Sequence, residues 1–207
     1  MVKILEITTI RSSCCIRLDN GEQYWIRRND ASASFFREGS EMDYDAFLQQ
    51  IRICQYPHAL NHAVLLLARR PYSKKEIITR LVRLRYTDEV ARLVVYRLEK
   101  DKLLNDQEFC NQWIHIRLSG SVGRSIIRRE LLMKGIPVQM IDEAFASLSP
   151  GDEQEGADVL ARKLWKRIGA DEDRRRNRQK VIFSIVRKGY GWDTARAACE
   201  KAEKELY

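Results

Sequence analysis

The sequence feature that most constrains the fold is a helix ending that occurs three times. In the clearest copy, Leu131-Leu132-Met133-Lys134-Gly135-Ile136-Pro137, a glycine closes an apolar helical run and a new helix starts directly afterwards. The pattern recurs at residues 81–87 and 185–191. Each ending is followed by an apolar residue: Tyr86, Ile136 and Tyr190. The residues 5, 8 and 12 positions further on are apolar in all three copies, and this spacing returns to one face of a helix.

These endings predict three degenerate copies of one helical unit in the last three quarters of the chain. Each unit is too short to bury much core alone, so the units are expected to stack in tandem. We therefore predict a mainly α fold: a tandem array of three three-helix repeats, similar in outline to helix-turn-helix units, after a small β-rich N-terminal extension. The predicted bounds are 1–57 for the extension and 58–102, 103–149 and 150–207 for the repeats.

Local signals place several helix ends. Ser73 followed by Glu76 is a capping box at the start of a second helix, and Pro137 suits a first helical turn. Pro150-Gly151 is expected to separate the second and third repeats, and Gly169 to end a helix. Arg85 occupies the position where the repeat expects glycine, so this helix must close in another way or through a strained residue.

The first 57 residues differ from the rest. Asn20-Gly21 lies between two strand-like runs, which is a hairpin signal because both residues tolerate positive φ. We predict three antiparallel strands at about 2–10, 13–18 and 23–28, a short helix capped by Asp30 and reaching about Phe36, and a helix from Asp43 to Ile53. The segment is either a folded cap on the helical array or a docking element for a second partner.

Positive charge is concentrated in the second helix of every repeat. The segments 73–86, 121–136 and 173–190 contain sixteen basic and three acidic residues, whereas the whole chain has a net charge of +8. The basic residues are Lys74, Lys75, Arg80, Arg83, Arg85, Arg124, Arg128, Arg129, Lys134, Arg174, Arg175, Arg176, Arg178, Lys180, Arg187 and Lys188. If the repeats stack in register, these helices form one basic stripe suited to phosphate backbones or an acidic protein groove. The alternative is an ordinary solvated helix face whose last-turn cations favour the helix C-terminus.

The sequence favours a binding protein over an enzyme. It contains no glycine-rich phosphate loop and no Ser/His/Asp arrangement, and we expect no catalytic residue, cofactor or metal. A zinc pair formed by His58 and His62, four residues apart, is the alternative to an ordinary core or surface role. The five cysteines lack metal-ligand spacing, so reduced thiols are expected, with a redox or metal role for Cys14-Cys15 as the alternative.

Three tryptophans, Trp113, Trp165 and Trp192, lie in apolar stripes, so we expect core packing rather than base stacking. No apolar run approaches the roughly 20 residues of a membrane span, and Glu6 interrupts the N-terminal apolar stretch, which therefore lacks a signal-peptide layout. We expect a cytoplasmic, monomeric protein with no membrane partner.

Two stretches resemble the RecX family. The central one begins with Leu104-Asn105-Asp106-Gln107-Glu108-Phe109, continues through Trp113, Ile114 and Arg117, and ends with Ile127-Arg128-Arg129-Glu130-Leu131-Leu132-Met133-Lys134-Gly135-Ile136. Arg70-Pro71-Tyr72-Ser73-Lys74-Lys75-Glu76-Ile77, with Leu81 and Tyr86, is similar to the first repeat of that family. The resemblance covers residues 58–207 well and residues 1–57 loosely.

The resemblance implies a modulator of the RecA recombinase that is not an enzyme. Such proteins bind in the groove of the filament that RecA forms on single-stranded DNA, and they usually inhibit strand exchange, ATP hydrolysis and co-protease activity. The expected partners are therefore the RecA filament and single-stranded DNA, with duplex DNA as a further possibility. The alternative hypothesis is a nonspecific DNA-binding module that acts independently of the recombinase.

Overall fold

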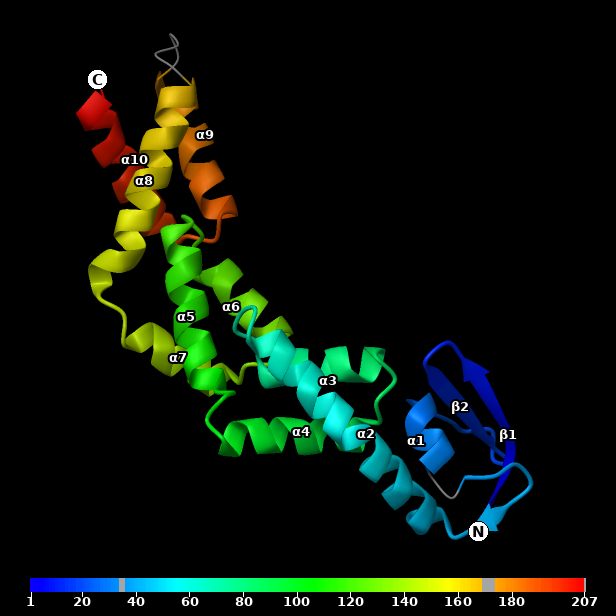
Figure 1. Ribbon diagram of the computed structural model, residues 1–207. Coiled ribbons are helices and arrows are strands. Elements are labelled where there is room, and N and C mark those ends of the chain that lie inside the picture. The colour runs from blue at the N-terminus through cyan, green and yellow to red at the C-terminus, as the bar shows by residue number, and fades with distance from the viewer. Residues whose placement is uncertain (34–35, 169–173, 207) are drawn as a thin grey trace. The chain divides into compact units, whose positions relative to one another are not determined.

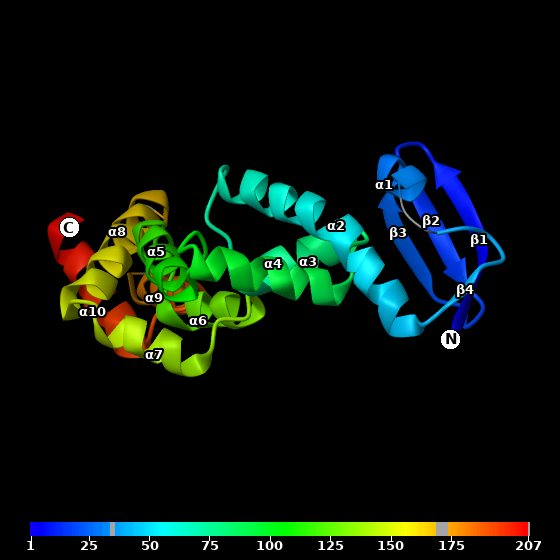
Figure 2. The same ribbon diagram turned by 60° about the horizontal axis from the view of Figure 1, so that its bottom comes forward.

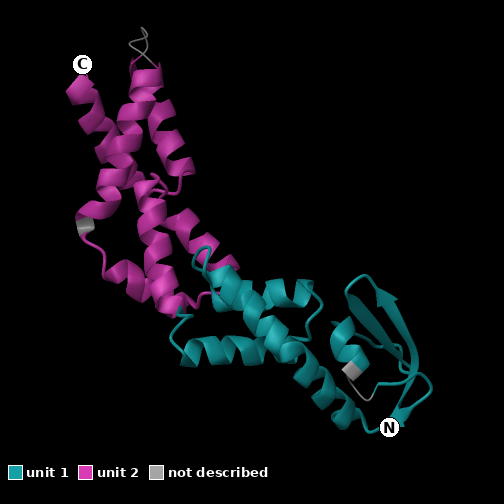
Figure 3. Ribbon diagram, in the orientation of Figure 1, with its two compact units in different colours: residues 1–105 teal, residues 106–207 magenta. Residues whose placement is uncertain are grey.

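The computed structural model describes residues 1–33, 36–168 and 174–206, and the chain forms two compact units, residues 1–105 and 106–207 (Figures 1 and 3). The fold is mainly α with a small N-terminal sheet, which confirms the predicted fold class. Among these described residues, the buried apolar side chains form four separate clusters, one beneath the sheet and one inside each helical repeat. Each repeat therefore has its own small core.

The sheet of unit 1 is antiparallel, with strand order β3-β2-β1-β4. Its strands are β1 (Val2–Ile10), β2 (Ser13–Leu18), β3 (Gln23–Arg27) and β4 (Glu41–Met42). The three predicted strands are confirmed, and Gly21 in the hairpin turn has a φ of 86°. The two-residue strand β4, which pairs with the start of β1, was not predicted.

The short helix after the sheet differs from its prediction. Helix α1 spans Arg28–Ala33, so Asp30 lies within its first turn instead of capping it. The predicted continuation of this helix to about Phe36 crosses residues 34 and 35, which lie outside the described residues. The Asp30 carboxylate instead meets the imidazole of His58, with an Oδ2–Nε2 distance of 2.9 Å.

Helix α2 (Tyr44–Leu67) is continuous where two separate helices were predicted. The expected end at Ile53 and the expected boundary between residues 57 and 58 both fall inside it, and Pro57 lies in its interior. Its buried residues recur every four positions and so form one stripe: Phe47, Ile51, Gln55, Ala59 and Ala63. The N-terminal part of this stripe packs in the cluster beneath the sheet and the C-terminal part in the core of the first repeat (Figure 2).

The first repeat is completed by α3 (Lys74–Arg83) and α4 (Asp88–Lys100). The predicted capping box is present: the Ser73 hydroxyl accepts from the Glu76 N–H, and the Glu76 carboxylate accepts from the Ser73 N–H. Thr87 caps α4, and Asp88 and Glu89 lie in its first turn, where negative charge is favoured. Ile77 and Leu81 turn the buried face of α3 toward α2 and α4.

Arg85 closes α3 through a strained backbone, as the sequence predicted among two possibilities. Its φ is 70°, in the left-handed region, as are those of Gly135 (84°) and Gly189 (93°) at the other two endings. The Arg85 N–H donates to the Val82 carbonyl and the Tyr86 N–H to the Leu81 carbonyl, so the last carbonyl groups of the helix are satisfied. A side chain at this position costs roughly 1 kcal/mol that glycine avoids.

We expect Arg85→Gly to be more stable than Arg85→Ala by about 1 kcal/mol, because both lose the guanidinium but only glycine relieves the left-handed strain. Thermal unfolding followed by circular dichroism measures the difference. The matched control is Thr79, an exposed residue within α3, where the order must reverse because alanine favours a helix interior. Equal stabilities of the two Arg85 variants would contradict this interpretation.

Unit 2 contains the other two repeats. Their helices are α5 (Asp106–Ser119), α6 (Arg124–Met133), α7 (Val138–Ala146), α8 (Pro150–Ile168), α9 (Arg174–Arg187) and α10 (Trp192–Leu206). Pro137 is the N-cap of α7 instead of its first helical residue, and Pro150 starts α8 instead of marking a break before it. The predicted helix end at Gly169 lies outside the described residues.

The two repeats of unit 2 meet through backbone contacts between two turns. The N–H of Gly123 donates to the Lys188 carbonyl at 2.8 Å, and the N–H and hydroxyl of Ser125 donate to the Gly189 carbonyl at 3.1 and 3.0 Å. Gly123 is the N-cap of α6 and provides no side chain for capping. The end of α9 therefore caps the start of α6, and these two second helices meet end to end.

Candidate functional site

The second helix of each repeat buries the same two positions. These positions lie nine and five residues before the apolar residue that follows the ending: Ile77 and Leu81, Ile127 and Leu131, and Val181 and Ile185. Most of the sixteen predicted cations lie on α3, α6 and α9, and Arg85, Lys134 and Lys188 follow within two residues of the ends of these helices. The structure brings α6 and α9 together within unit 2, whereas α3 belongs to unit 1.

Four of the predicted cations form ion pairs with a neighbouring helix. Three of them occupy one repeated position, twelve residues before the apolar residue: Lys74 pairs with Glu99, Arg124 with Glu153 at 2.7 Å, and Arg178 with Glu200. The fourth, Arg128, pairs with Asp142, and its hydrogen bond lowers the pKa of that carboxyl group. These cations hold the second helix against its neighbours, so their charge is partly neutralised, in the case of Arg124 by a carboxylate of the next repeat.

Three further cations lie over aromatic rings. The guanidinium of Arg85 lies 3.8 Å from the ring centre of Trp25, and that of Arg80 lies 5.0 Å from Tyr72. The ammonium of Lys134 lies 4.1 Å from the ring centre of Trp113. Such contacts fix the direction of the charge while leaving its outer side in water.

The remaining cations divide into two groups. Arg174 and Arg176, at the start of α9, interact with other groups. In the part of the chain that the structure describes, the side chains of the other seven form neither an ion pair nor a ring contact; they are Lys75, Arg83, Arg129, Arg175, Lys180, Arg187 and Lys188. All seven are exposed, so they are the cations most available to a partner.

Large apolar side chains are exposed beside these available cations. Val82 (42% exposed) and Leu84 (54%) flank Arg83 at the end of α3, and Leu132 (41%) and Met133 (65%) follow Arg129 on α6. A face intended only for solubility would not need them, since apolar side chains gain nothing from facing water. These surfaces combine arginine with exposed apolar area, and arginine and methionine are both enriched at protein interfaces.

An aromatic pair on α9 and α10 was missed by the sequence analysis. Phe183 and Trp192 are 55% and 48% exposed, and their ring centres are 5.3 Å apart in an edge-to-face arrangement. The prediction that Trp192 packs in the core is therefore wrong, although Trp165 is buried as predicted. Lys180 and Arg187 lie three residues before and four after Phe183, on the same face of α9.

Several residues of the stretch that resembles the RecX family form a partly buried hydrogen-bond network in the second repeat. The Glu130 carboxylate accepts hydrogen bonds from the Trp113 indole N–H at 3.0 Å and from Arg117 Nε and Nη2 at 2.9 and 2.6 Å. The Lys134 ammonium lies over the Trp113 ring, 4.1 Å from its centre. These side chains join α5 to α6. The residues on which the resemblance to the RecX family rests therefore stabilise the second repeat.

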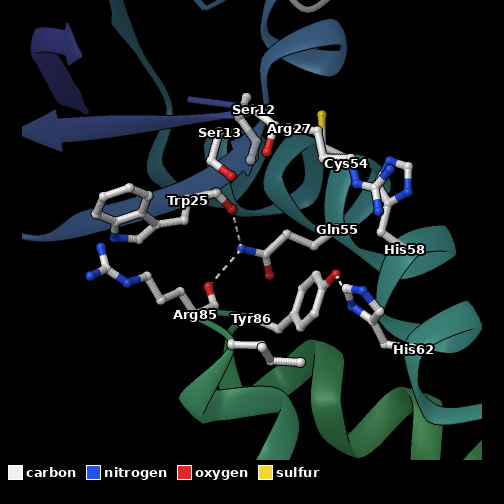
Figure 4. Close-up of a pocket in the computed structure, with 12 residues that line it drawn as sticks. Ser12, Ser13, Trp25, Arg27, Cys54, Gln55, His58, His62, Arg85 and Tyr86 are labelled. Carbon is white, nitrogen blue, oxygen red and sulfur yellow. Dashed lines mark hydrogen bonds between the residues drawn. The ribbon is translucent and has the colours of Figure 1, made fainter. Parts of the chain in front are cut away.

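A pocket of about 410 Å³ lies within unit 1, between the sheet and the start of the first repeat (Figure 4). Gln55 is only 2% exposed and connects the walls of the pocket. The side-chain N–H group of Gln55 donates to the carbonyls of Trp25 and Arg85, and the side-chain oxygen accepts from the Thr87 N–H. Arg27 also lines the pocket and was not among the predicted cations.

The two histidines suggested as a zinc pair have other partners in this pocket. His58 Nε2 contacts the Asp30 carboxylate, and His62 Nδ1 lies 2.7 Å from the Tyr86 hydroxyl. Burial lowers the pKa of His62, and the charges of Arg27 and His58 act in the same direction. Among the described residues, no group of three or more potential ligand side chains could hold a metal ion. The five cysteines are free thiols, three of them buried.

No described helix combines the length and the apolar character needed to cross a membrane. The chain matches two family models, the first three-helix domain of RecX at residues 59–98 and the second at residues 105–144.

Comparisons over longer stretches agree with these matches. The regulatory protein RecX of Streptomyces coelicolor is 32% identical over 142 residues, which cover 68% of this chain and 74% of that protein. The regulatory protein RecX of Streptococcus gordonii is 26% identical over 206 residues, covering 99% and 78%. A crystal structure of regulatory protein RecX shares the fold with a TM-score of 0.64 at 22% identity, covering 99% of this chain and 100% of that one. By sequence and by fold, this chain belongs to the RecX family.

Proposed function

We propose that this protein binds the filament that RecA forms on single-stranded DNA and inhibits its strand-exchange, ATPase and co-protease activities. It acts as a cytoplasmic binding protein and not as an enzyme. The contact surface is the exposed face of each second helix, where available cations and apolar side chains lie together. This mixture is the single observation that carries the proposal, because a filament offers both phosphates and protein surface.

The end-to-end contact of α9 and α6 supports the proposal within unit 2. Because the end of α9 caps the start of α6, the two cation-bearing helices are joined directly within unit 2. The exposed Phe183–Trp192 pair adds an aromatic surface beside Lys180 and Arg187. Aromatic rings beside arginine or lysine suit both unstacked bases and protein anchors.

The alternative is nonspecific DNA binding that does not require the recombinase. Cations alone would suffice for that function, and the exposed Leu132 and Met133 would then have no role. Equal affinity for bare single-stranded DNA and for the filament, with a steep dependence on salt concentration, is the result expected from this alternative.

The test replaces four available cations, Lys75, Arg83, Arg129 and Arg187, with glutamate in one variant. We expect its half-inhibitory concentration in a RecA ATPase assay on single-stranded DNA to rise at least about tenfold, since several phosphate contacts are lost together. Arg124 and Arg128 are left unchanged because their ion pairs with Glu153 and Asp142 would be broken.

The matched control reverses four exposed cations outside the second helices: Lys100, Lys163, Arg196 and Lys204. Both variants change the net charge equally, so long-range attraction to DNA falls by a similar amount in each. We expect the control to inhibit nearly as well as the unchanged protein. Inhibition that weakens equally in both variants, with unaltered helical circular dichroism, would rule out a localised contact surface.

A further inference from the structure

We propose that the pocket between the sheet and α2 binds one nucleoside phosphate, with the phosphate at its histidine end and the base at its tryptophan end. The pocket is lined by residues from the sheet, α2 and the turn after α3, all of which belong to unit 1. Its volume of about 410 Å³ is within the range of small-molecule sites. The inference rests on the proposed function and extends it, because the pocket would hold one nucleotide of the kind that makes up a single DNA strand.

The charges of the pocket favour an anion. Of the described residues that line it, none is acidic, whereas Arg27 and Arg85 are cationic. Arg27 is close enough to His62 to lower the pKa of that imidazole, which places positive charge at this end of the pocket. The Asp30 carboxylate, which meets His58 at this end, is already engaged by that imidazole. A phosphate here would meet the Arg27 guanidinium and the imidazole groups.

The opposite end of the pocket offers a surface for stacking. Figure 4 shows Trp25 and Arg85 at one end and His58 and His62 at the other, with Gln55 between them. The Arg85 guanidinium stacks on the Trp25 ring at 3.8 Å, so one face of the indole is already covered and a base would extend this stack from an outer face. Aromatic rings and guanidinium planes are the groups on which proteins stack unpaired bases.

The walls of this pocket are fixed before a ligand arrives. Gln55 bonds the backbone of Trp25, Arg85 and Thr87 at once, so β3 and the turn after α3 are held at a set separation. The left-handed backbone of Arg85 directs the chain into this arrangement at a cost in strain. A preformed site loses little entropy on binding. The other two helix endings have glycine at this position. Glycine at position 85 would relieve the strain but would remove the guanidinium that stacks on Trp25.

Three histidines make the experiment specific. His58 and His62 line the pocket, whereas His115 is in unit 2 and serves as an internal control. Deoxythymidine monophosphate, added to the full chain to about 10 mM, should shift the imidazole NMR resonances of His58 and His62 but not His115, with a millimolar dissociation constant. Thymidine, which lacks the phosphate, should bind at least roughly tenfold more weakly.

A pair of neighbouring variants separates the pocket from general charge. Arg27→Gln should weaken binding of the monophosphate roughly tenfold, and Arg28→Gln should leave it unchanged, because Arg28 carries the same charge but does not line the pocket. Competition by oligothymidylate would identify a DNA strand as the source of the nucleotide; its failure to compete would identify a free nucleotide. Both results support the site.

The site would be overturned by the absence of shifts at His58 and His62 with either ligand, or by equal shifts at His115. This outcome is separate from failure of the proposed function, which is tested by the four-cation variant of the second helices. That variant leaves Arg27 and Arg85 in place and should bind the monophosphate normally. If the protein fails to bind the monophosphate but the second-helix test of filament inhibition gives the expected result, only the pocket proposal is rejected.

Discussion

Replacing Gly123 with alanine should destabilise unit 2 by at least about 3 kcal/mol, because the added methyl group has no room. A Cβ built on Gly123 would lie 2.2 Å from the Gly189 carbonyl carbon and 2.3 Å from the Tyr190 nitrogen. These neighbours are backbone atoms, so they cannot move aside as a flexible side chain would. The two turns must separate, and the bonds by which α9 caps α6 are then lost.

Thermal unfolding followed by circular dichroism measures this effect, and a loss of 3 kcal/mol corresponds to a fall in Tm of more than about 10 °C for a domain of this size. The control is Gly151→Ala. No atom lies within 4 Å of a Cβ at Gly151, which is in α8, so alanine there should be neutral or stabilising. A Gly123→Ala protein that melts within about 2 °C of the original would show that the two turns do not need this close approach.

The second large effect is expected at Glu130. Glu130→Ala removes the acceptor of three hydrogen bonds and leaves Arg117, whose side chain is 34% exposed, without its partner. We expect a loss of about 2 kcal/mol, less than for a fully buried pair because water reaches the guanidinium. Glu130→Gln should lose about half as much, because its amide oxygen still accepts one of the bonds.

A double-mutant cycle with Arg117→Ala tests the assignment to this network. The sum of the two single losses should exceed the loss measured for the double variant by about 1 kcal/mol or more, because each single change already removes the shared interaction. Glu143→Ala provides the control, since Glu143 is an exposed carboxylate on α7 in the same unit. Additive losses at Glu130 and Arg117 would mean that each residue acts through separate contacts.

The repeat itself could be predicted because it depends on local chemistry. Gly135 and Gly189 end helices by adopting positive φ, and Ser73 starts one by capping it, so both signals lie within a few residues of the feature they specify. The strained backbone at Arg85 could be predicted for the same reason, since a residue other than glycine has few ways to close a helix at this position.

The continuity of α2 was not predicted, and the helix runs through Pro57 although proline usually ends a helix. The structure keeps the helix because the buried stripe is uninterrupted across the proline, from Ile51 through Gln55 to Ala59. The four-residue spacing of that stripe was the available signal. Burial on both sides of the proline outweighs the single backbone hydrogen bond that proline removes.

The division of the cations could not be predicted from sequence. Lys74, Arg124 and Arg178 share a repeated position, but their partners come from α4, α8 and α10, and helix packing alone decides which carboxylate each one meets. The basic stripe across all three repeats remains a prediction. The seven available cations are a smaller set than the sixteen that the sequence indicated. Arg27 was missed because its neighbours in space are distant in sequence.

The shared helix α2 makes the sheet and the first repeat one cooperative folding unit. Phe47 and Ile51 anchor the helix beneath the sheet, and Ala59 and Ala63 anchor it in the repeat, so neither half keeps its helix once the other has unfolded. The amide hydrogens of the whole helix should therefore exchange with solvent through one common opening. Ligand bound at the sheet would then slow exchange in the first helical repeat as well.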